Sequence, residues 1–343
     1  MHHEKAQSLE AAIALLPRTR LGIMPTPLEH LPRLSAALGG PPIYIKRDDL
    51  TGLGFGGNKT RMLELSLAEG LARGADTVVF GAAVQSNYCR QLAAACAKLG
   101  LELHLYLRPE REIDTQEIQG NHLLQRLFGA KVTILDSNDR SRQQAIIKAA
   151  AEQLRQAGKQ VYLPRQPDTV DLDVIAYAES ALEIVRQCDA LGIEPQALYV
   201  TAFDTTQAGT VLGITYLESS MQVKGFTPID MPLDQRIQKM VDMSNQAAER
   251  LGLDIELSAQ HFDNDDSFIG ERYGIPTPEG LEALRLMART EGILLDPVYT
   301  SKGFAALINH IRAGKLNPKQ PVVFLHTGGA PALFGYANEL LAE

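Results

Sequence analysis

The segment IKRDDLTGLGFGGNKTR (residues 45–61) decides how the chain is interpreted, because a run of glycines leads directly into a lysine at a predicted helix start. Glycines let the backbone approach a ligand closely and adopt left-handed conformations. A lysine that is partly desolvated at such a point can lose its proton and attack an aldehyde. Lys59 is therefore a candidate nucleophile. The alternative is that it merely begins a solvated helix.

Short apolar runs and helical patterns alternate through the rest of the chain. Cys89, Leu92, Cys96 and Leu99 keep a helical period, and Gly100 follows as a stop. The alternation predicts a parallel α/β sheet whose ligand loops lie at the carboxyl ends of the strands. The strand-like runs are TVVF (77–80), LELHLYL (101–107), KVTILD (131–136), QVYLP (160–164), ALYVTA (197–202) and PVVFLH (321–326).

Composition limits the class of protein. The chain has 343 residues, of which 45% are hydrophobic and 22% charged, and this is enough for a large core and two domains. A net charge of −8 argues against a nucleic acid or an anionic membrane as partner. There is no apolar run of about 20 residues and no secretion signal, and the three cysteines lack metal-ligand spacing. We therefore expect a cytoplasmic protein without a membrane span or a metal.

Three polar features have plain structural interpretations. His2 and His3 are expected in a disordered terminus rather than at a metal. The acidic run at 263–266 lacks the glycine and the final glutamate of a calcium loop, so a solvated loop is expected. His326 ends a predicted strand and is expected to be a structural hydrogen-bonding group rather than a base.

GGNKTR (56–61) resembles the lysine motif of the 1-aminocyclopropane-1-carboxylate (ACC) deaminase / D-cysteine desulfhydrase family of fold-type II pyridoxal-phosphate enzymes. Further motifs follow the family order: PTPLEHLPRLSAALGG (25–40), IKRDDLTG (45–52), AVQSNYCRQ (83–91), YGIPTPEG (273–280), LLDPVYTSKG (294–303) and HTGGAPALFGY (326–336). The resemblance implies a two-domain, tryptophan synthase β-like α/β fold with parallel twisted sheets flanked by helices, and a homodimer. We expect residues 1–61 and 171–343 to form the larger cofactor domain and residues 62–170 a smaller inserted α/β domain.

The resemblance also implies the roles of the site residues. Lys59 would hold pyridoxal 5'-phosphate covalently and move protons, and Tyr273 and Tyr299 would line the active site as possible acids or bases. Ser86, a catalytic candidate that can equally be a plain helix N-cap, lies where free backbone N–H groups suit a carboxylate. The implied cofactor-binding residues are Lys59, Asn58, Asn87, Thr205, Thr206, Gln207, Ala208, Gly209 and Thr327. The implied substrate-binding residues are Ser86, Asn87, Gln85, Tyr88 and Thr300.

Two threonines bear on the substrate. ACC deaminases carry a glutamate and a leucine at the positions of Thr300 and Thr327, and the threonine pair looks like D-cysteine desulfhydrase. The resemblance thus implies β-elimination from a small amino acid, with D-cysteine giving pyruvate, ammonia and sulfide. ACC deamination, L-cysteate sulfo-lyase activity and a non-catalytic binding protein stay open as alternatives.

Three positions depart from the family pattern. Met62 stands where a lysine helps to hold the cofactor phosphate, Asp204 stands in the phosphate loop, and Tyr88 replaces histidine or glutamine. Two like unit charges about 4 Å apart repel by about 4 kcal/mol at an effective dielectric of about 20. Either Asp204 points away, another cation compensates, or phosphate binding is weak.

Overall fold

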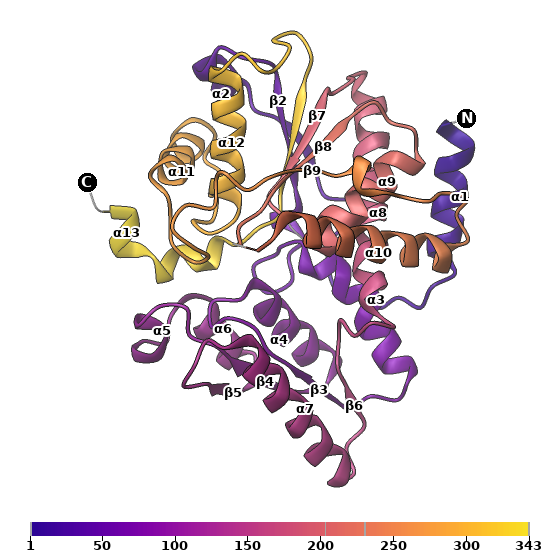
Figure 1. Cartoon of the computed structure of the whole chain (residues 1–343), viewed down its shortest axis with the longest axis vertical. Helices are drawn as coiled ribbons and strands as arrows, with labels where there is room; N and C mark the ends of the chain where they lie inside the picture. Colours follow the sequence, from indigo (N-terminus) through magenta and orange to yellow (C-terminus); the bar gives the residue numbers. More distant parts are fainter. Residues whose placement is uncertain (1, 203, 230, 342–343) are drawn as a thin grey trace.

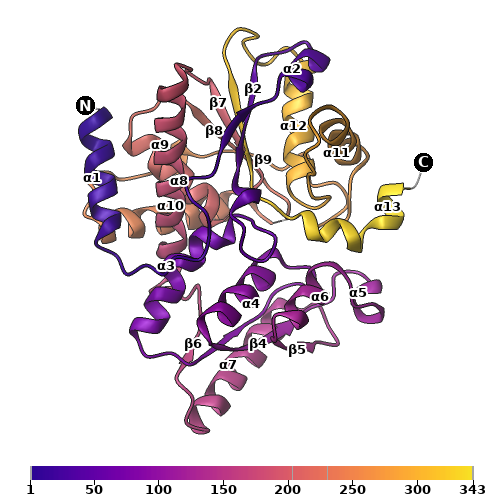
Figure 2. The same cartoon turned by 180° about the vertical axis from the view of Figure 1, so that it is seen from behind.

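Two sheets form the framework of the molecule, one in each lobe of Figure 1. The computed structural model describes residues 2–202, 204–229 and 231–341. The lower lobe holds the middle of the chain, from β3 to β6, and the upper lobe holds both ends (Figures 1 and 2). The sheet of the upper lobe has the order β1-β2-β10-β7-β8-β9, and that of the lower lobe β5-β4-β3-β6.

The upper sheet brings together strands from distant parts of the sequence. Among the described residues, β1 and β2 pair antiparallel, and the other neighbouring strands of this sheet pair in parallel. The central strands β7 and β10 are buried along their whole length, as expected where helices cover both faces. The strands are β1 (Leu28–His30), β2 (Ile43–Arg47), β7 (Ala197–Val200), β8 (Gln222–Phe226), β9 (Asp263–Asp265) and β10 (Val322–His326).

Helices pack on both faces of this sheet. One hydrophobic cluster joins the sheet to α1 (His2–Ala14), α8 (Val170–Leu191), α9 (Thr205–Tyr216) and α10 (Leu233–Leu251). The other cluster joins the opposite face to α2 (Pro32–Leu38), α11 (Pro278–Glu291) and α12 (Thr300–Arg312). The remaining elements of this lobe are η1 (Asp48–Leu50), η2 (Ala259–His261), η3 (Ala330–Gly335) and α13 (Ala337–Leu341).

The lower lobe is a second, smaller α/β layer structure. All its strand pairs are parallel. The strands are β3 (Thr77–Phe80), β4 (Glu102–Leu107), β5 (Lys131–Ile134) and β6 (Val161–Tyr162), and the helices are α3 (Lys59–Ala72), α4 (Asn87–Leu99), α5 (Ile113–Gln116), α6 (Gly120–Leu127) and α7 (Arg140–Gln156). α3 runs from the upper lobe into the lower one (Figure 1), so it crosses the expected boundary at 61/62. The expected domain limits stay a prediction.

Two local expectations are wrong. The N-terminus is helical from His2, because Leu9 and Ile13 pack into the cluster around α8 and stabilise α1. Part of the acidic run forms the edge strand β9, whose backbone pairs with β8. His326 is buried and its ring bonds to the backbone of Leu294 and Gly328, as expected of a structural group.

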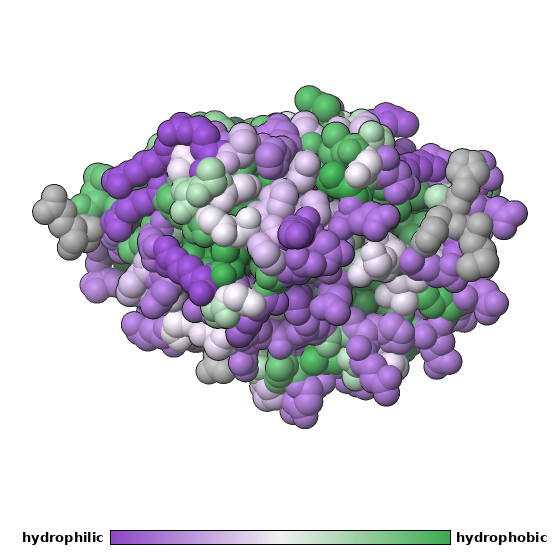
Figure 3. All heavy atoms as spheres, turned by 90° about the horizontal axis from the view of Figure 1, so that it is seen from above, coloured by the Kyte–Doolittle hydropathy of each residue, from purple (hydrophilic) through white to green (hydrophobic). Residues whose placement is uncertain are grey.

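The surface and the helices add two observations. On the face shown in Figure 3, hydrophilic side chains predominate and hydrophobic ones form separate patches. Within the described ranges, none of the helices is both long and apolar enough to cross a membrane.

Candidate active site

A cavity of about 310 Å³ lies where the carboxyl ends of strands from both sheets meet. Thr201 follows β7, Thr327 follows β10 and Gly81 follows β3, and all three residues line it. The volume is at the lower end of the range of about 300–1,000 Å³ typical of small-molecule sites. The position at the strand ends is the one that the α/β pattern predicted.

Lys59 is the first residue of α3 and lines this cavity. The glycine loop before it is tight: a Cβ on Gly56, whose φ is 70°, would lie 1.9 Å from the carbonyl oxygen of Asp49. Asn58 then connects the start of α3 to the residue after β10 and to the first turn of α9. Its backbone N–H donates to the carbonyl of Thr327 (2.9 Å), and its amide nitrogen donates to the Thr206 hydroxyl (3.0 Å).

The surroundings of Lys59 favour its neutral form. Burial lowers the pKa of its amine from 10.5 to about 8, and the charge of Arg165 contributes to the same shift. The carboxylates of Asp173 and Asp204 oppose it. A neutral amine is the nucleophilic form, so this lysine suits attack on an aldehyde at moderate pH.

The start of α4 forms another wall of the cavity, lined by Ser86, Asn87 and Tyr88. Ser86 is the N-cap, because its hydroxyl accepts the N–H of Cys89 (3.2 Å). Asn87 accepts a hydrogen bond from Asn121 (2.9 Å). The side-chain amide of Gln85 instead contacts the backbone at Gln119 and Asn121 and does not line this cavity.

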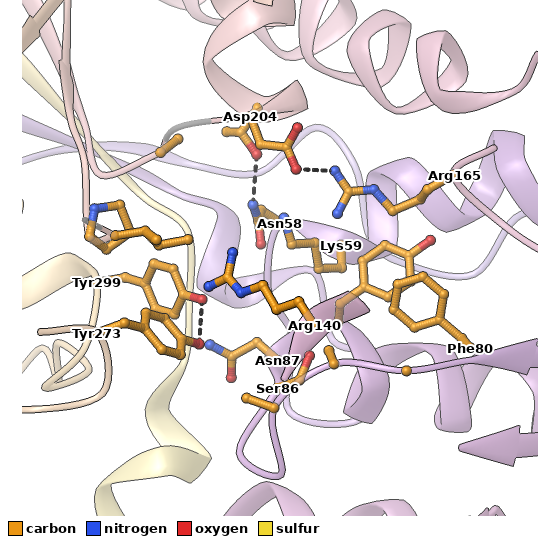
Figure 4. A pocket seen from close by; sticks show the side chains of 18 of the residues that line it. Asn58, Lys59, Phe80, Ser86, Asn87, Arg140, Arg165, Asp204, Tyr273 and Tyr299 are labelled. Atoms are coloured by element: carbon orange, nitrogen blue, oxygen red, sulfur yellow. Dashed lines mark hydrogen bonds and ion pairs between the residues drawn. The ribbon is translucent and has the colours of Figure 1, made fainter. Parts of the chain in front are cut away.

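Tyr273 and Tyr299 lie next to each other in the cavity wall (Figure 4). Their hydroxyl oxygens are 2.7 Å apart. Burial raises the pKa of both phenols. They therefore stay protonated at physiological pH and can donate a hydrogen bond rather than remove a proton.

The first turn of α9 carries the expected phosphate-binding residues, but only part of it faces the cavity. Thr206 lines the cavity, and the Thr205 hydroxyl lies 4.0 Å from the Met62 sulfur. Gln207 exchanges two hydrogen bonds of 2.8 Å with Asn264, away from the cavity. Ala208 is buried in the core. Gly209 packs against α8, where a Cβ would lie 2.0 Å from the carbonyl oxygen of Val174.

Thr300 is also turned away from the cavity. It is fully buried, and its hydroxyl donates to the Asp296 carboxylate (2.7 Å) and accepts the Asp296 N–H (2.7 Å). The same carboxylate accepts the N–H groups of Val298, Tyr299 and Thr300. In the described structure Thr300 thus fixes the start of α12 beside Tyr299.

The structure also shows what lies beside Asp204. The carboxylate forms an ion pair with Arg165, a cavity residue of the segment after β6 (Figure 4). A cation therefore compensates Asp204, which was one of the three alternatives. The arginines that line the cavity, none of which the sequence motifs indicated, are Arg108, Arg140, Arg165 and Arg236.

The donor set fits pyridoxal phosphate. Lys59 supplies an amine for the aldehyde, and Thr206 and the arginines suit a phosphate. Two residues that line the cavity, Tyr88 and Thr201, have buried hydroxyls that make no hydrogen bond with any described residue. Across the described ranges, no group of three or more His, Cys, Asp or Glu residues is arranged to hold a metal ion.

Comparisons with known proteins show the family of the chain. A family model described as pyridoxal-phosphate dependent enzyme matches residues 19–328. The D-cysteine desulfhydrase of Salmonella typhi is 38% identical over 324 residues, which are 93% of this chain and 96% of that protein. The D-cysteine desulfhydrase of Salmonella newport (strain SL254) is 37% identical with the same coverage.

Two solved structures have a fold similar to that of this chain. A crystal structure described as that of an ACC deaminase homologue superposes with a TM-score of 0.87 at 33% identity, covering 97% of this chain and 98% of that one. O-ureido-L-serine synthase shares the fold alone, with a TM-score of 0.67 at 17% identity over 94% of this chain and 95% of that one. The chain therefore belongs to the pyridoxal-phosphate-dependent enzymes of fold type II, and among them to the ACC deaminase / D-cysteine desulfhydrase family.

Proposed function

We propose that this enzyme is a β-eliminating lyase that converts D-cysteine and water into pyruvate, ammonia and hydrogen sulfide. The observation that carries the proposal is the convergence of Lys59 and the start of α4 in one cavity of an enzyme that is 38% identical to a D-cysteine desulfhydrase. Lys59 supplies a nucleophilic amine. The start of α4 supplies backbone N–H groups and a positive dipole end that suit an amino-acid carboxylate.

Pyridoxal phosphate, when bound, supplies an electron sink for negative charge at the substrate Cα. Lys59 would hold the cofactor, and its amine would remove the proton from the substrate Cα. The lowered pKa of Lys59 suits this task, because a general base works best with a pKa near the operating pH. The β-substituent would leave as sulfide. Addition of water and loss of ammonia would then give pyruvate, which accounts for all products of the proposed reaction.

The remaining wall residues would bind and orient the substrate. Ser86 and Asn87 are proposed to receive the carboxylate at the start of α4, and the Ser86 hydroxyl can do so without giving up its capping role. Tyr273 and Tyr299 are proposed to act as hydrogen-bond donors, since their raised pKa values keep both phenols protonated. Tyr88 lines the same wall and is proposed to shape the substrate pocket.

One observation favours a second substrate. Four arginines line the cavity, and a substrate with a second anionic group would be attracted to them. L-cysteate carries such a group, a sulfonate that would leave as sulfite. It is the second candidate.

A product assay distinguishes the candidates. With added cofactor, we expect pyruvate and sulfide from D-cysteine faster than pyruvate and sulfite from L-cysteate or 2-oxobutanoate from ACC. The Lys59→Ala variant should be inactive and should lack the absorption band of the lysine-bound cofactor. Faster turnover of L-cysteate or ACC would overturn the D-cysteine assignment. A protein that binds the cofactor but turns over none of the three would favour a non-catalytic binding role.

We further propose that the enzyme is cytoplasmic and works as a homodimer. The three cysteines are unpaired and buried, which fits a reducing compartment. The family resemblance supports the dimer, and light scattering of the purified protein would test it: a monomer mass would contradict the proposal.

A further inference from the structure

Arg165 joins the end of the small sheet to the first turn of α9. Its backbone has a φ of 62°, a left-handed conformation that is uncommon outside glycine. Its guanidinium pairs with Asp204, lies 3.1 Å (Nε to Oδ2) from the carboxylate of Asp173, and donates to the Thr205 hydroxyl (3.4 Å). Asp204 and Arg165 both line the cavity that contains Lys59, and their side chains point toward each other in Figure 4.

The place of this ion pair is one that attracts anions. Asp204 is the N-cap residue of α9, yet its side chain caps none of the backbone N–H groups and is directed to Arg165 instead. The helix end, the Thr206 hydroxyl and a guanidinium therefore converge on one end of the cavity. A phosphate monoester, which carries nearly two negative charges at pH 7, is the group of the cofactor that suits this combination.

Near the first turn of α9, helix α3 presents the uncharged side chain of Met62. Met62 projects from α3 with its sulfur 4.0 Å from the Thr205 hydroxyl. Further positive charge comes from the cavity residue Arg236: burial lowers its pKa, the charge of Asp204 raises it, and the charges of Arg140 and Arg165 lower it. Such a group of cations is stabilised by an anion.

We propose that Arg165 is the cation that binds the cofactor phosphate, and that the phosphate displaces the Asp204 carboxylate from Arg165. Asp204 is then an internal competitor that neutralises Arg165 until the cofactor arrives. Asp173, which is fully buried behind Arg165, keeps the guanidinium in place when Asp204 is displaced. The inference rests on the cofactor of the proposed function and assigns a residue that the family motifs do not contain.

The test is a pair of spectral titrations with pyridoxal phosphate and with pyridoxal, which has the same aldehyde but no phosphate. The readout is the ratio of the two dissociation constants, because any change in the reactivity of Lys59 affects both aldehydes equally. Because Arg165→Gln removes a hydrogen-bonded charge, we expect it to weaken the binding of pyridoxal phosphate relative to that of pyridoxal by about 10- to 100-fold. Asp204→Asn should change the ratio in the opposite direction, since it removes the competing carboxylate.

Two controls define the result. Arg142→Gln makes the same charge change at an exposed residue of α7 that pairs with Asp136 (3.0 Å), and it should leave the ratio unchanged. Arg165→Lys should restore part of the effect, because it keeps the charge but not the forked donors. If Arg165→Gln does not fold, the direction in which Asp204→Asn changes the ratio of dissociation constants tests the proposal.

Three outcomes would overturn the inference. An Arg165→Gln ratio equal to that of the wild type would remove Arg165 from the phosphate site. An Asp204→Asn ratio that is unchanged or shifted toward weaker pyridoxal phosphate would exclude the exchange of partners. Wild-type protein that binds neither aldehyde would overturn the proposed function as well, whereas the first two outcomes leave that function intact.

Discussion

At the scale of single residues, Lys59 combines a motif with an unusual environment. Burial and the neighbouring Arg165 lower the pKa of its amine to about 8. Attack on an aldehyde needs the neutral amine, and the neutral fraction increases as the pH rises through the pKa. The rate at which the protein takes up pyridoxal phosphate should therefore increase with pH, with a midpoint near 8. Stopped-flow absorption from pH 6 to 10 measures this.

The measured midpoint of cofactor uptake has to be compared with the usual pKa of a lysine side chain. A midpoint close to 10.5, the usual value for lysine, would mean that the cavity does not desolvate the amine. A surface lysine reacting without specificity would give the same high midpoint, so the Lys59→Ala variant provides the baseline.

The sequence indicated Lys59, Ser86, Asn87, Tyr273 and Tyr299, and the structure brings all five to one cavity. Each of them lies in a motif that resembles those of the family. Arg165 was not indicated, because its importance comes from the contact with Asp204, 39 positions later, and no motif surrounds it. Asp204 was recognised as a departure from the pattern, but only the folded chain shows which cation faces it.

At the scale of elements, the start of α12 depends on a cluster around Asp296. The carboxylate accepts three backbone N–H groups and the Thr300 hydroxyl, and so fixes Tyr299 at the cavity wall. Thr300→Val keeps the shape but removes the hydroxyl, which leaves the buried Asp296 N–H without its acceptor. We expect the free energy of unfolding to fall by about 1–3 kcal/mol, measured by urea titration.

The control is Ser301→Ala on the same turn, because the Ser301 hydroxyl is buried and has no hydrogen-bond partner among the described residues. This variant should be nearly neutral. Kinetics of the Thr300→Val variant test whether Thr300 binds the substrate, as the family resemblance implied. A higher KM for the amino acid without loss of stability would support substrate binding and contradict the structural role.

Elements with strong patterns were predicted well from the sequence. The apolar runs that became β3, β7 and β10 are almost entirely buried, so their hydrophobicity alone indicates strands, and β4 is indicated by alternating buried and half-buried residues. β9 was missed because it consists of Asp263, Asn264 and Asp265, and the backbone pairing with β8 that holds it is not visible in the side chains. α1 was missed because its apolar residues are stabilising only when they pack against α8, more than 150 residues away.

At the scale of the whole molecule, the ends of the chain close the upper sheet. β10 lies between β2 and β7, so a strand near residue 325 holds together two strands near 45 and 200. Local patterns contain no information about this order. The absence of a long flexible linker predicted only that the smaller domain is an insertion and that both ends of the chain form the larger one. The cavity depends on this closure, because Thr327 at the end of β10 accepts the N–H of Asn58 next to Lys59.

A buried charge network links the segments that meet at this closure. Arg61 of α3, only 1% exposed, bonds to Asp48 after β2 and to Glu183 of α8, and Lys46 of β2 bonds to the same glutamate. Burial alone would raise the pKa of Asp48, but Arg61 and Lys46 hold it below its usual value. Two cations and two carboxylates thus balance inside the protein.

Removing one member should destabilise the whole molecule. Arg61→Met fills a similar volume but leaves Asp48 buried without its main counter-charge, so the free energy of unfolding should fall by about 3–5 kcal/mol. The matched control is Arg73→Met at the other end of α3, where the arginine is 47% exposed and pairs with Glu69 and Asp168. An exposed pair contributes about 0–1 kcal/mol. Equal losses in the two variants, measured by urea unfolding, would show that the buried network does not hold the segments together.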